Sequence, residues 1–340
     1  MRSRVWILVA VVGCGGGELR AGDGTVSGAT TSDPHGSTST PLPDDPDDRD
    51  PQPAGDTGDP VDSGLVDTGT GTSGAAACTL GAPSTRHFTL QLPFEGQTRS
   101  AIVDLPDDYD GSEVRPLVLN FHGLATTAQQ QKTYTGMAGA ANARGWIAVH
   151  PDGTNRSWDW LPESQDVRFV DALLDELSAQ LCVDERRVYL TGLSNGGYFS
   201  YQFACDRGDR ITAIAPVAGA QTSPVCNPGV KVPLLHIHGT DDDTVPYDGN
   251  LISPGARESV TRWAERVNDC HTDPEETAVI GDVRCETWSC SPIDSASLCT
   301  VEGGGHTWPG TVPLPLLGET NQDIDATEEI LDFFARWARP

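Results

Sequence analysis

The chain has 340 residues and a formal net charge of −27, because 49 acidic side chains face only 22 lysines and arginines. This charge balance leaves no basic stripe that could neutralise a phosphate backbone, so we expect no nucleic-acid partner. The length would accommodate one large or two ordinary domains, but the first quarter of the chain has too few large apolar side chains to contribute to a core.

The first fourteen residues resemble a bacterial lipoprotein signal peptide with its lipobox. A basic start, Met1–Arg4, is followed by an apolar stretch, Val5–Val12, and by small residues before Cys14. The resemblance implies that Cys14 is the lipidated first residue of an extracellular or cell-envelope protein, which would contact the membrane only through its lipid anchor. The apolar run is too short to span a bilayer. A plain secretory signal, or a wrongly assigned start codon, is the alternative.

Residues 15–77 are rich in Gly, Ser, Thr, Pro and Asp. They contain twelve acidic side chains against two arginines, a net charge of −10. Such a segment buries too little apolar surface to offset its ordering entropy, so we expect a disordered acidic tether. The folded domain is then expected to cover residues 78–340.

Two alternating segments, Phe88–Leu92 and Ser100–Leu105, predict strands joined by a turn at Glu95-Gly96, as an antiparallel edge. The pattern then changes to near-continuous apolar runs at Pro116–Phe121 and Trp146–His150, which predict strands buried on both faces. An Ala- and Gln-rich segment between these two runs predicts a helix.

Strands and helices continue to alternate through the rest of the chain. The further predicted elements are a helix with its apolar stripe from Phe169 to Leu181, a strand at Val188–Leu190, strands at Ile211–Ala218, Pro233–His238 and Leu298–Val301, and helices around Val260–Val267 and Asp325–Ala338. This alternation predicts an α/β fold with one mostly parallel, doubly wound sheet and helices on both of its faces.

A candidate nucleophile lies where one strand turns into a helix. Ser194 is the centre of Gly192-Leu193-Ser194-Asn195-Gly196, the spacing of a nucleophile elbow. Glycine is needed on both sides because a side chain there would collide with the backbone of so tight a turn.

A serine hydroxyl needs a base to take its proton, and the base needs an orienting carboxylate. Asp242 follows the predicted strand that ends at His238, and His306 follows the strand that ends near Val301. The order Ser, Asp, His is typical of α/β-hydrolases. We assign Ser194, Asp242 and His306 as the catalytic residues, with Asp241 as the second choice for the acid.

The oxyanion of an ester intermediate requires two backbone donors. We assign them to the amide of Asn195, directly after the nucleophile, and to the amide of Leu124 in the loop after the first buried strand. His122, in the same loop, is interpreted as a structural residue.

Eight cysteines remain after Cys14, an even number that suggests four disulfides in an exported protein. We expect one bridge between Cys182 and Cys205, bracing the nucleophile elbow from both sides. A second is expected between Cys290 and Cys299, closing the segment between them. The remaining pairings stay open.

Four sequence blocks together resemble the polyhydroxybutyrate depolymerase-like and feruloyl esterase-like enzymes of the first carbohydrate esterase family. They are Phe121–Gly123, Arg187–Gly197, His238–Tyr247 and Gly305–Gly310. The resemblance implies an α/β-hydrolase that cleaves carboxylic esters through an acyl-enzyme, with no cofactor and no metal. It also supports Asp242, because the family places its aspartate two residues beyond the threonine of the His-Gly-Thr block.

The chain departs from this family in the loop that carries Trp158 and Trp160, which is short and lacks the family's paired cysteines. These two side chains and Trp308 are candidates for stacking on a sugar or an aromatic acid. The alternative is that they pack the scaffold.

The expected function is therefore that of a secreted or lipid-anchored serine esterase acting on feruloyl or acetyl esters of plant polysaccharide. A short-chain polyhydroxyalkanoate depolymerase is the alternative within the same chemistry. A non-catalytic surface lipoprotein that binds a ligand is the alternative from another class. The sequence does not indicate the oligomeric state.

Overall fold

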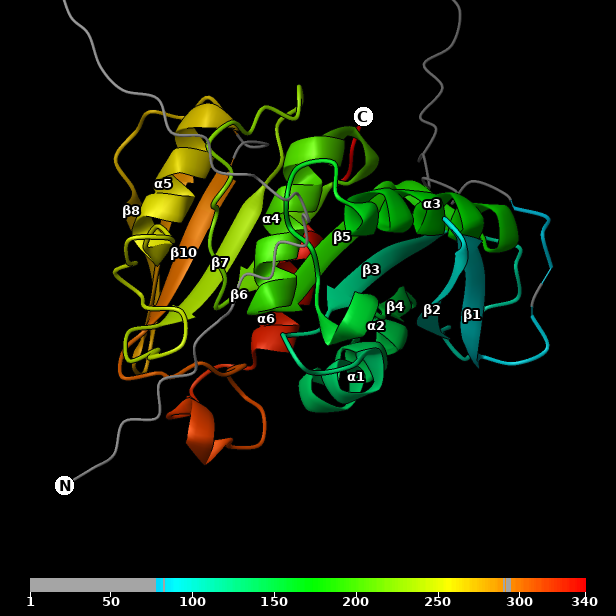
Figure 1. Cartoon of the computed structure of the whole chain (residues 1–340), viewed down its shortest axis with the longest axis horizontal. Helices are drawn as coiled ribbons and strands as arrows, with labels where there is room; N and C mark the ends of the chain where they lie inside the picture. Colours follow the sequence, from blue (N-terminus) through cyan, green and yellow to red (C-terminus); the bar gives the residue numbers. More distant parts are fainter. Residues whose placement is uncertain (1–77, 82, 290, 292–294) are drawn as a thin grey trace, which may run out of the picture. The chain divides into compact units, whose positions relative to one another are not determined.

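A computed structural model of the chain describes residues 78–340, except for 82, 290 and 292–294 (Figure 1). The expected signal peptide, the lipidation site Cys14 and the tether all lie outside the described residues. The described residues form one sheet of ten strands in the order β1-β2-β4-β3-β5-β6-β7-β10-β9-β8. None of the helices that the structure describes combines the length and apolarity needed to cross a membrane.

The antiparallel edge predicted near the start of the domain is confirmed. Strand β1 (His87–Phe94) lies at the margin of the sheet and pairs with β2 (Gln97–Asp104), so that Phe94 faces Gln97 across a two-residue turn. Both turn residues, Glu95 and Gly96, have positive φ angles of 45° and 79°. This is the backbone that a tight hairpin requires.

The centre of the sheet is parallel, as the buried apolar runs indicate. Register pairs run in parallel from β4 through β3, β5, β6 and β7 to β10. The strands are β3 (Arg115–Phe121), β4 (Ile147–Pro151), β5 (Val183–Leu193), β6 (Ala213–Val217), β7 (Leu234–Gly239) and β10 (Ser295–Val301). Their carboxyl ends therefore meet at one edge, which is where open α/β sheets place their sites.

Helices cover both faces of this sheet, which confirms the doubly wound architecture (Figure 1). One apolar core contains buried side chains of α3 (Gln165–Gln180), α4 (Asn195–Arg207) and α5 (Ala256–Arg266). The second core contains those of α2 (Met137–Ala143) and α6 (Ala326–Phe334). Successive residues of β3 contribute to opposite cores, Leu117 to the first and Val118 to the second, as the pleat of a strand requires.

The Ala- and Gln-rich segment forms two short helices instead of one. Helix α1 (Ala128–Thr135) ends at Gly136, whose φ of 65° is the left-handed conformation that terminates many helices, and α2 begins at the next residue. Side-chain caps fix the starts of α3 and α6. Ser164 accepts a hydrogen bond from Val167 at the start of α3, and Asp325 does the same for Thr327 at the start of α6.

Two strands of the structure were not expected from the sequence. Strands β8 (Glu275–Ile280) and β9 (Val283–Ser289) form an antiparallel extension beyond β10. Most side chains of β8 are exposed, so the strand lacks the apolar alternation that reveals a half-buried strand.

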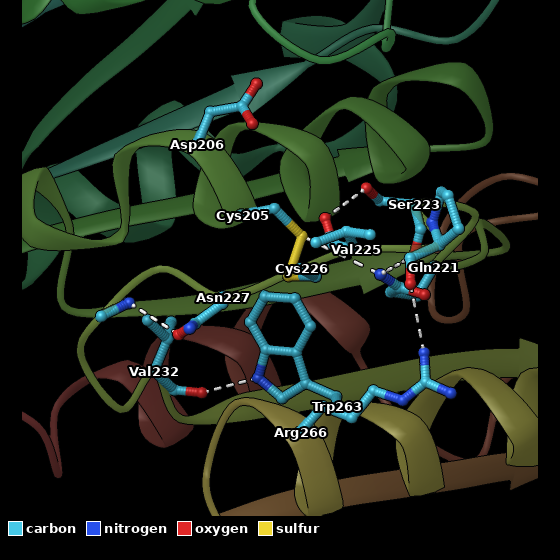
Figure 2. The surroundings of a disulfide bond; sticks show 12 residues. Cys205, Asp206, Gln221, Ser223, Val225, Cys226, Asn227, Val232, Trp263 and Arg266 are labelled. Atoms are coloured by element: carbon cyan, nitrogen blue, oxygen red, sulfur yellow. Dashed lines mark hydrogen bonds between the residues drawn. A yellow bond between two sulfur atoms is a disulfide. The ribbon is translucent and has the colours of Figure 1, made fainter. Parts of the chain in front are cut away.

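The expected bridge between Cys182 and Cys205 is wrong, because Cys182 is bonded to Cys78 and Cys205 to Cys226. The eleven residues of β5 rise roughly 35 Å, whereas α4 returns only about 15 Å before it reaches Cys205. The two cysteines therefore lie at different heights along the sheet. Figure 2 shows Cys205 on α4 bonded to Cys226, in the same apolar cluster as the indole of Trp263.

The second expected bridge is also wrong for Cys299, which is bonded to Cys285. Strand β10 begins at Ser295, so Cys299 lies inside a strand and not at the end of a closed turn. The antiparallel register places Cys285 directly opposite it on β9. Cys290 lies outside the described residues, and Cys270 is disulfide-bonded as well.

Candidate active site

Three residues assigned from the sequence lie at the carboxyl edge of neighbouring strands. Ser194 follows β5, Asp242 follows β7, and His306 follows β10. In the sheet, β7 lies directly beside β10, and β6 separates β7 from β5. The fold therefore places at one edge of the sheet a serine, an aspartate and a histidine that span 112 residues of the sequence, since 306 − 194 = 112.

Ser194 occupies the strained turn that its glycine neighbours predict. Its φ and ψ angles are 57° and −118°, a conformation that non-glycine residues rarely adopt. A Cβ on Gly192 would lie 2.7 Å from the carbonyl of Gly196, and one on Gly196 would lie 2.3 Å from the oxygen of Phe121. Only glycine fits at either position, so the elbow is built by close backbone contact with β3.

The hydroxyl of Ser194 is not used by the fold. The residue is the N-cap of α4, a place where serine commonly accepts a hydrogen bond from the helix, yet its side chain makes no capping bond. Within the part of the chain that the structure describes, Ser194 Oγ has no hydrogen-bond partner, His306 included. Hydrogen bonds of this kind are often long without substrate and shorten when it binds.

Asp242 and His306 form a buried pair, in which His306 Nδ1 lies 2.7 Å from Asp242 Oδ2. The other carboxylate oxygen, Oδ1, accepts from the amides of Thr244 and Val245, both at 2.8 Å. His238 Nε2 is a fourth neighbour, 3.3 Å from Oδ2. By contrast, Asp241 is exposed and its carboxylate makes no hydrogen bond or ion pair with His306, so the geometry favours Asp242 as the partner of the histidine.

These contacts determine the charge of Asp242. Its burial opposes ionisation, but the hydrogen bonds from His238 and His306 outweigh that cost and hold its pKa well below the ordinary range. An ionised carboxylate only accepts hydrogen bonds. His306 must therefore donate from Nδ1 to this carboxylate, so that in the neutral ring Nε2 is the nitrogen that can act as a base.

Both assigned oxyanion donors have free amides. Among the described residues, neither the N–H of Leu124 nor that of Asn195 donates a hydrogen bond. The loop of Leu124 lies against the elbow, since a Cβ on Gly123 would be 3.6 Å from Ser194 Cβ. Two unpaired donors next to a strained serine are what an oxyanion site requires.

The side chain of Asn195 has a role that the sequence did not reveal. Its Oδ1 accepts from the amide of Trp158 at 2.7 Å, and its Nδ2 donates to the carbonyl of the same residue at 3.0 Å. These two hydrogen bonds join the elbow to the loop after β4. His122, buried with Nδ1 at 2.8 Å from the Gly123 oxygen and Nε2 accepting from the Gly153 amide, has the structural role expected for it.

Two of the three tryptophans proposed to contact substrate are buried, so that assignment is corrected. Trp158 is 1% exposed and packs against Phe121 and Phe199. Trp308 is fully buried and donates from Nε1 to Thr327. Both indoles pack the scaffold, the alternative that the sequence left open.

Trp160 remains partly exposed at the site. Its ring stacks on that of Tyr198, one helical turn after Ser194, with centroids 5.3 Å apart. The hydroxyl of Tyr198 in turn forms a hydrogen bond with Ser253 at 2.9 Å. Tyr198 thus links Trp160 to the loop after β7.

Exposed apolar side chains lie on the loops that carry these residues. Leu251 and Ile252 are almost fully exposed and directly precede Ser253. Leu316 is also fully exposed, next to Leu317, whose carbonyl accepts the amide of His306 at 2.6 Å. Isolated exposed leucines are common, but these three lie on loops anchored to the site.

The site has no arrangement of ligands for a metal. In residues 78–340, excluding the undescribed positions, no three His, Cys, Asp or Glu side chains are grouped to bind a metal ion.

Comparison with known proteins gives consistent relatives. No family model matches the chain. Feruloyl esterase B of Piromyces equi is 30% identical over 230 residues, which cover 61% of this chain and 42% of that protein. Feruloyl esterase D of Neurospora crassa is 30% identical over 179 residues, covering 49% of this chain and 61% of that protein. The chain thus spans less than two thirds of the length of either relative.

The structure of an acetyl xylan esterase from Aspergillus awamori superimposes with a TM-score of 0.56. The match covers 73% of this chain and 99% of that one at 14% sequence identity, so it bears on the fold alone. Over part of its length the chain is thus similar in sequence to feruloyl esterases, and its mostly parallel sheet with two helical layers shares the fold of the acetyl xylan esterase structure.

Proposed function

We propose that the chain is a serine carboxylic-ester hydrolase with Ser194, Asp242 and His306 as its catalytic residues. The observation that carries the proposal is the buried hydrogen bond between His306 and Asp242, at the sheet edge where Ser194 occupies a strained turn with a free hydroxyl. The similarity to feruloyl esterases supports the same chemistry.

In the acylation step, Ser194 Oγ attacks the carbonyl carbon of the ester while His306 Nε2 takes the hydroxyl proton. The C=O bond becomes a single bond to an oxyanion, which the amides of Leu124 and Asn195 stabilise. His306 is then a cation beside the ionised Asp242. When the intermediate collapses, the C–O bond to the alcohol breaks and the histidine gives its proton to the departing oxygen.

Deacylation repeats these steps with water as the nucleophile. His306 removes a proton from water, the resulting hydroxide attacks the acyl carbon, and the bond to Ser194 Oγ breaks with return of the proton. The acid is released and the enzyme regains its starting state. No step needs an oxidant, a reductant or a metal.

The substrate class we propose is a feruloyl or acetyl ester of plant polysaccharide. The support comes from the names of the relatives, which are feruloyl esterases, and from Trp160, which stacks on Tyr198 in the first turn of the helix after Ser194. A partly exposed indole offers a flat face on which an aromatic acid or a sugar ring can stack.

A polyester such as short-chain polyhydroxybutyrate is the second candidate substrate. The observation that favours it is the set of exposed apolar side chains, Leu251, Ile252 and Leu316, on loops anchored to the site. A polymer surface without charge would bury these side chains on contact, whereas a soluble polysaccharide would leave them in water.

We also propose that the protein is exported. Its support is the disulfides among the described residues, which link Cys78 to Cys182, Cys205 to Cys226 and Cys285 to Cys299. Disulfides persist in oxidising compartments and are rare in the cytosol of mesophiles. Lipid attachment through Cys14, with residues 15–77 as the tether, is part of the same proposal.

The test is turnover of a short nitrophenyl ester, methyl ferulate, acetylated xylan and a hydroxybutyrate oligomer by wild type and Ser194→Ala. We expect serine-dependent hydrolysis, strongest on methyl ferulate or acetylated xylan, with unchanged melting of the variant. The polyester would be the substrate if the oligomer is turned over fastest. Retained activity in Ser194→Ala would refute the assignment of the nucleophile, and wild type that is inactive on all four esters would favour the non-catalytic binding protein.

A further inference from the structure

A row of buried aromatic side chains lies behind Asp242, away from His306. His238 and His236 are alternate residues of β7, and their rings are joined by a contact of 2.9 Å between His238 Nδ1 and His236 Nε2. Tyr201, on α4, follows with its hydroxyl 2.8 Å from His236 Nδ1. All three side chains are at most 2% exposed, so water does not complete their hydrogen bonds.

The chemistry of the two ends determines the direction of every hydrogen bond in this row. His238 Nε2 faces the carboxylate of Asp242 at 3.3 Å and the carbonyl oxygen of Val245 at 2.8 Å. Both of these groups only accept, so Nε2 must carry a proton. In a neutral ring Nδ1 then accepts, and His236 Nε2 must be its donor.

The same reasoning continues to the far end. With its proton on Nε2, neutral His236 accepts at Nδ1, and the hydroxyl of Tyr201 supplies the donor. The row therefore donates in one direction, from Tyr201 through His236 and His238 to Asp242. Burial lowers the pKa of His236 and raises that of Tyr201, so both groups are neutral, as this direction requires.

The alternative arrangement leaves groups without partners. If His238 carried protons on both nitrogens, His236 would have to accept at Nε2 and donate from Nδ1 to the oxygen of Tyr201. The hydroxyl proton of Tyr201 would then lack an acceptor, since the ring of His236 is the only hydrogen-bond partner of this hydroxyl among the described residues. A buried polar group without a partner is costly, so the neutral arrangement is favoured.

We propose that His238 is a positioning residue for the carboxylate of Asp242, and that Tyr201 and His236 fix the tautomer in which His238 donates to it. The inference rests on the proposed function, because it gives Asp242 the role of orienting His306. Its physical content is that Oδ2 is shared by two donors, His306 Nδ1 at 2.7 Å and His238 Nε2 at 3.3 Å.

Sharing this oxygen affects the basicity of His306. A donor on Oδ2 withdraws negative charge from the carboxylate, so the His306 cation is stabilised less than it would be by an unshared aspartate. Removal of the His238 donor should therefore strengthen the stabilisation of the His306 cation by Asp242 and move the acidic limb of kcat/KM to higher pH. The titratable groups that face Asp242 are His238 on β7, His306 after β10 and Tyr198 on α4, while Asp241 and Asp243 beside it are exposed.

The experiment compares His238→Asn with His238→Gln. The asparagine amide reaches only the position of ring Nδ1, so it can accept from His236 but cannot donate to Asp242. The glutamine amide nitrogen reaches the position of Nε2, so it keeps the donor to Asp242. The two variants thus test the hydrogen bonds of Nδ1 and Nε2 separately. For each variant, kcat and KM are measured from pH 4 to 9 on a nitrophenyl ester.

We expect His238→Asn to lower kcat about tenfold, to leave KM within about twofold, and to shift the acidic limb of kcat/KM upward by about 0.5 to 1 pH unit. His238→Gln should retain the wild-type limb. A merely structural role would lower the activity of both variants without moving the limb. Wild-type limbs in both folded variants would overturn the proposal.

A second measurement tests the direction of the row in the wild-type protein and needs no variant. The ¹⁵N shifts of labelled histidine side chains distinguish a protonated from an unprotonated ring nitrogen. For both His236 and His238 we expect a proton on Nε2 and none on Nδ1. A proton on Nδ1 of either ring would refute the proposal even if the variants fail to fold. Ser194→Ala is assayed in parallel, so that loss of the proposed function is seen separately from loss of the His238 effect.

Discussion

The two halves of the site differ in how their polar groups are used. In the carboxylate half, Asp242 has four neighbouring donors, and a row of buried, hydrogen-bonded side chains leads from it to Tyr201 on α4. In the nucleophile half, Ser194 Oγ and the amides of Leu124 and Asn195 have no partner among the described residues. In the carboxylate half the polar groups are hydrogen-bonded to one another, whereas in the nucleophile half the hydroxyl and the two amides have no hydrogen-bond partner in the part of the chain that the structure describes.

This difference matches what each half must do in ester hydrolysis. A carboxylate that orients a histidine has the same charge before and during the reaction, so its partners can be built into the fold. Donors for an oxyanion are needed only when the charge develops, and donors already paired in the ground state would not be available. The following predictions break one half at a time.

The largest effect should come from Asp242→Asn, with Asp241→Asn as the matched control. The amide cannot hold His306 with its proton on Nδ1, so we expect kcat to fall about 10³-fold or more. Asp241 is exposed and lacks contact with His306, and its variant should retain activity within about threefold. Equal losses in the two variants, measured with a nitrophenyl ester, would contradict the assignment of Asp242.

The nucleophile half depends on backbone contact, which Gly196→Ala should break. The new Cβ would lie 2.3 Å from the oxygen of Phe121, so β3 and the elbow must separate. We expect a loss of about 2–4 kcal/mol in the free energy of unfolding together with most of the activity.

Gly139→Ala is the control for this glycine. Its Cβ would meet nothing within 4 Å on the exposed side of α2, so the variant should be stabilised by about 0.5–1 kcal/mol. The free energies of unfolding of both variants are measured by denaturant titration. A Gly196→Ala protein as stable as wild type would show that the elbow has room for a Cβ atom at this position.

Acid should lower the stability of the folded protein, because its buried histidines are neutral and must take up a proton when the chain unfolds. One of them, His236, belongs to the carboxylate half of the site. His150 allows a test away from the site, because burial lowers its pKa to about 3. In the unfolded chain this residue takes up a proton near pH 6.5. Between about pH 3 and pH 6.5 the unfolded state therefore binds more protons than the folded state. The free energy of unfolding falls as the pH falls, by about 1.4 kcal/mol per pH unit.

Replacement of His150 by leucine should therefore flatten the decline of melting temperature between pH 6.5 and 4. His271→Gln serves as the control, since this side chain is 68% exposed. Parallel curves for His150→Leu and wild type would show that His150 does not contribute to the acid sensitivity.

The smallest effect is expected for Trp160→Ala. Removal of the partly exposed ring that stacks on Tyr198 should raise KM for methyl ferulate about three- to tenfold and change stability by less than about 1 kcal/mol. Trp158→Ala should do the opposite. It should cost about 3–5 kcal/mol of stability, because that ring is buried against Phe121 and Phe199. A Trp158→Ala protein with native stability and raised KM would restore the sequence-based interpretation.

The sequence predicted the elements whose pattern depends on burial alone. The parallel strands are buried on both faces, so their runs of apolar residues identify them, and glycine spacing identifies the elbow of Ser194. Strand β8 could not be found in this way because its side chains are mostly exposed. The pairings of Cys182, Cys205 and Cys299 depend on which segments lie side by side, which spacing along the chain does not determine.

The candidate site shows the same division. Ser194, Asp242 and His306 follow from strand ends and motif blocks. The burial of Trp158 and Trp308 depends on three-dimensional packing, and the sequence left it open. A signal for the supporting row was present, since His236 and His238 alternate on a strand and must share one face. Only the structure shows that this face leads from Asp242 to Tyr201.

The central claim is that Ser194 becomes covalently acylated with the help of His306 and Asp242. The most direct measurement is intact-protein and peptide mass spectrometry after reaction with a fluorophosphonate, on wild type, Ser194→Ala and Asp242→Asn. We predict one adduct per chain on Ser194, none on Ser194→Ala, and much slower labelling of Asp242→Asn. Wild type that forms no adduct, or forms it on another residue, would contradict the account.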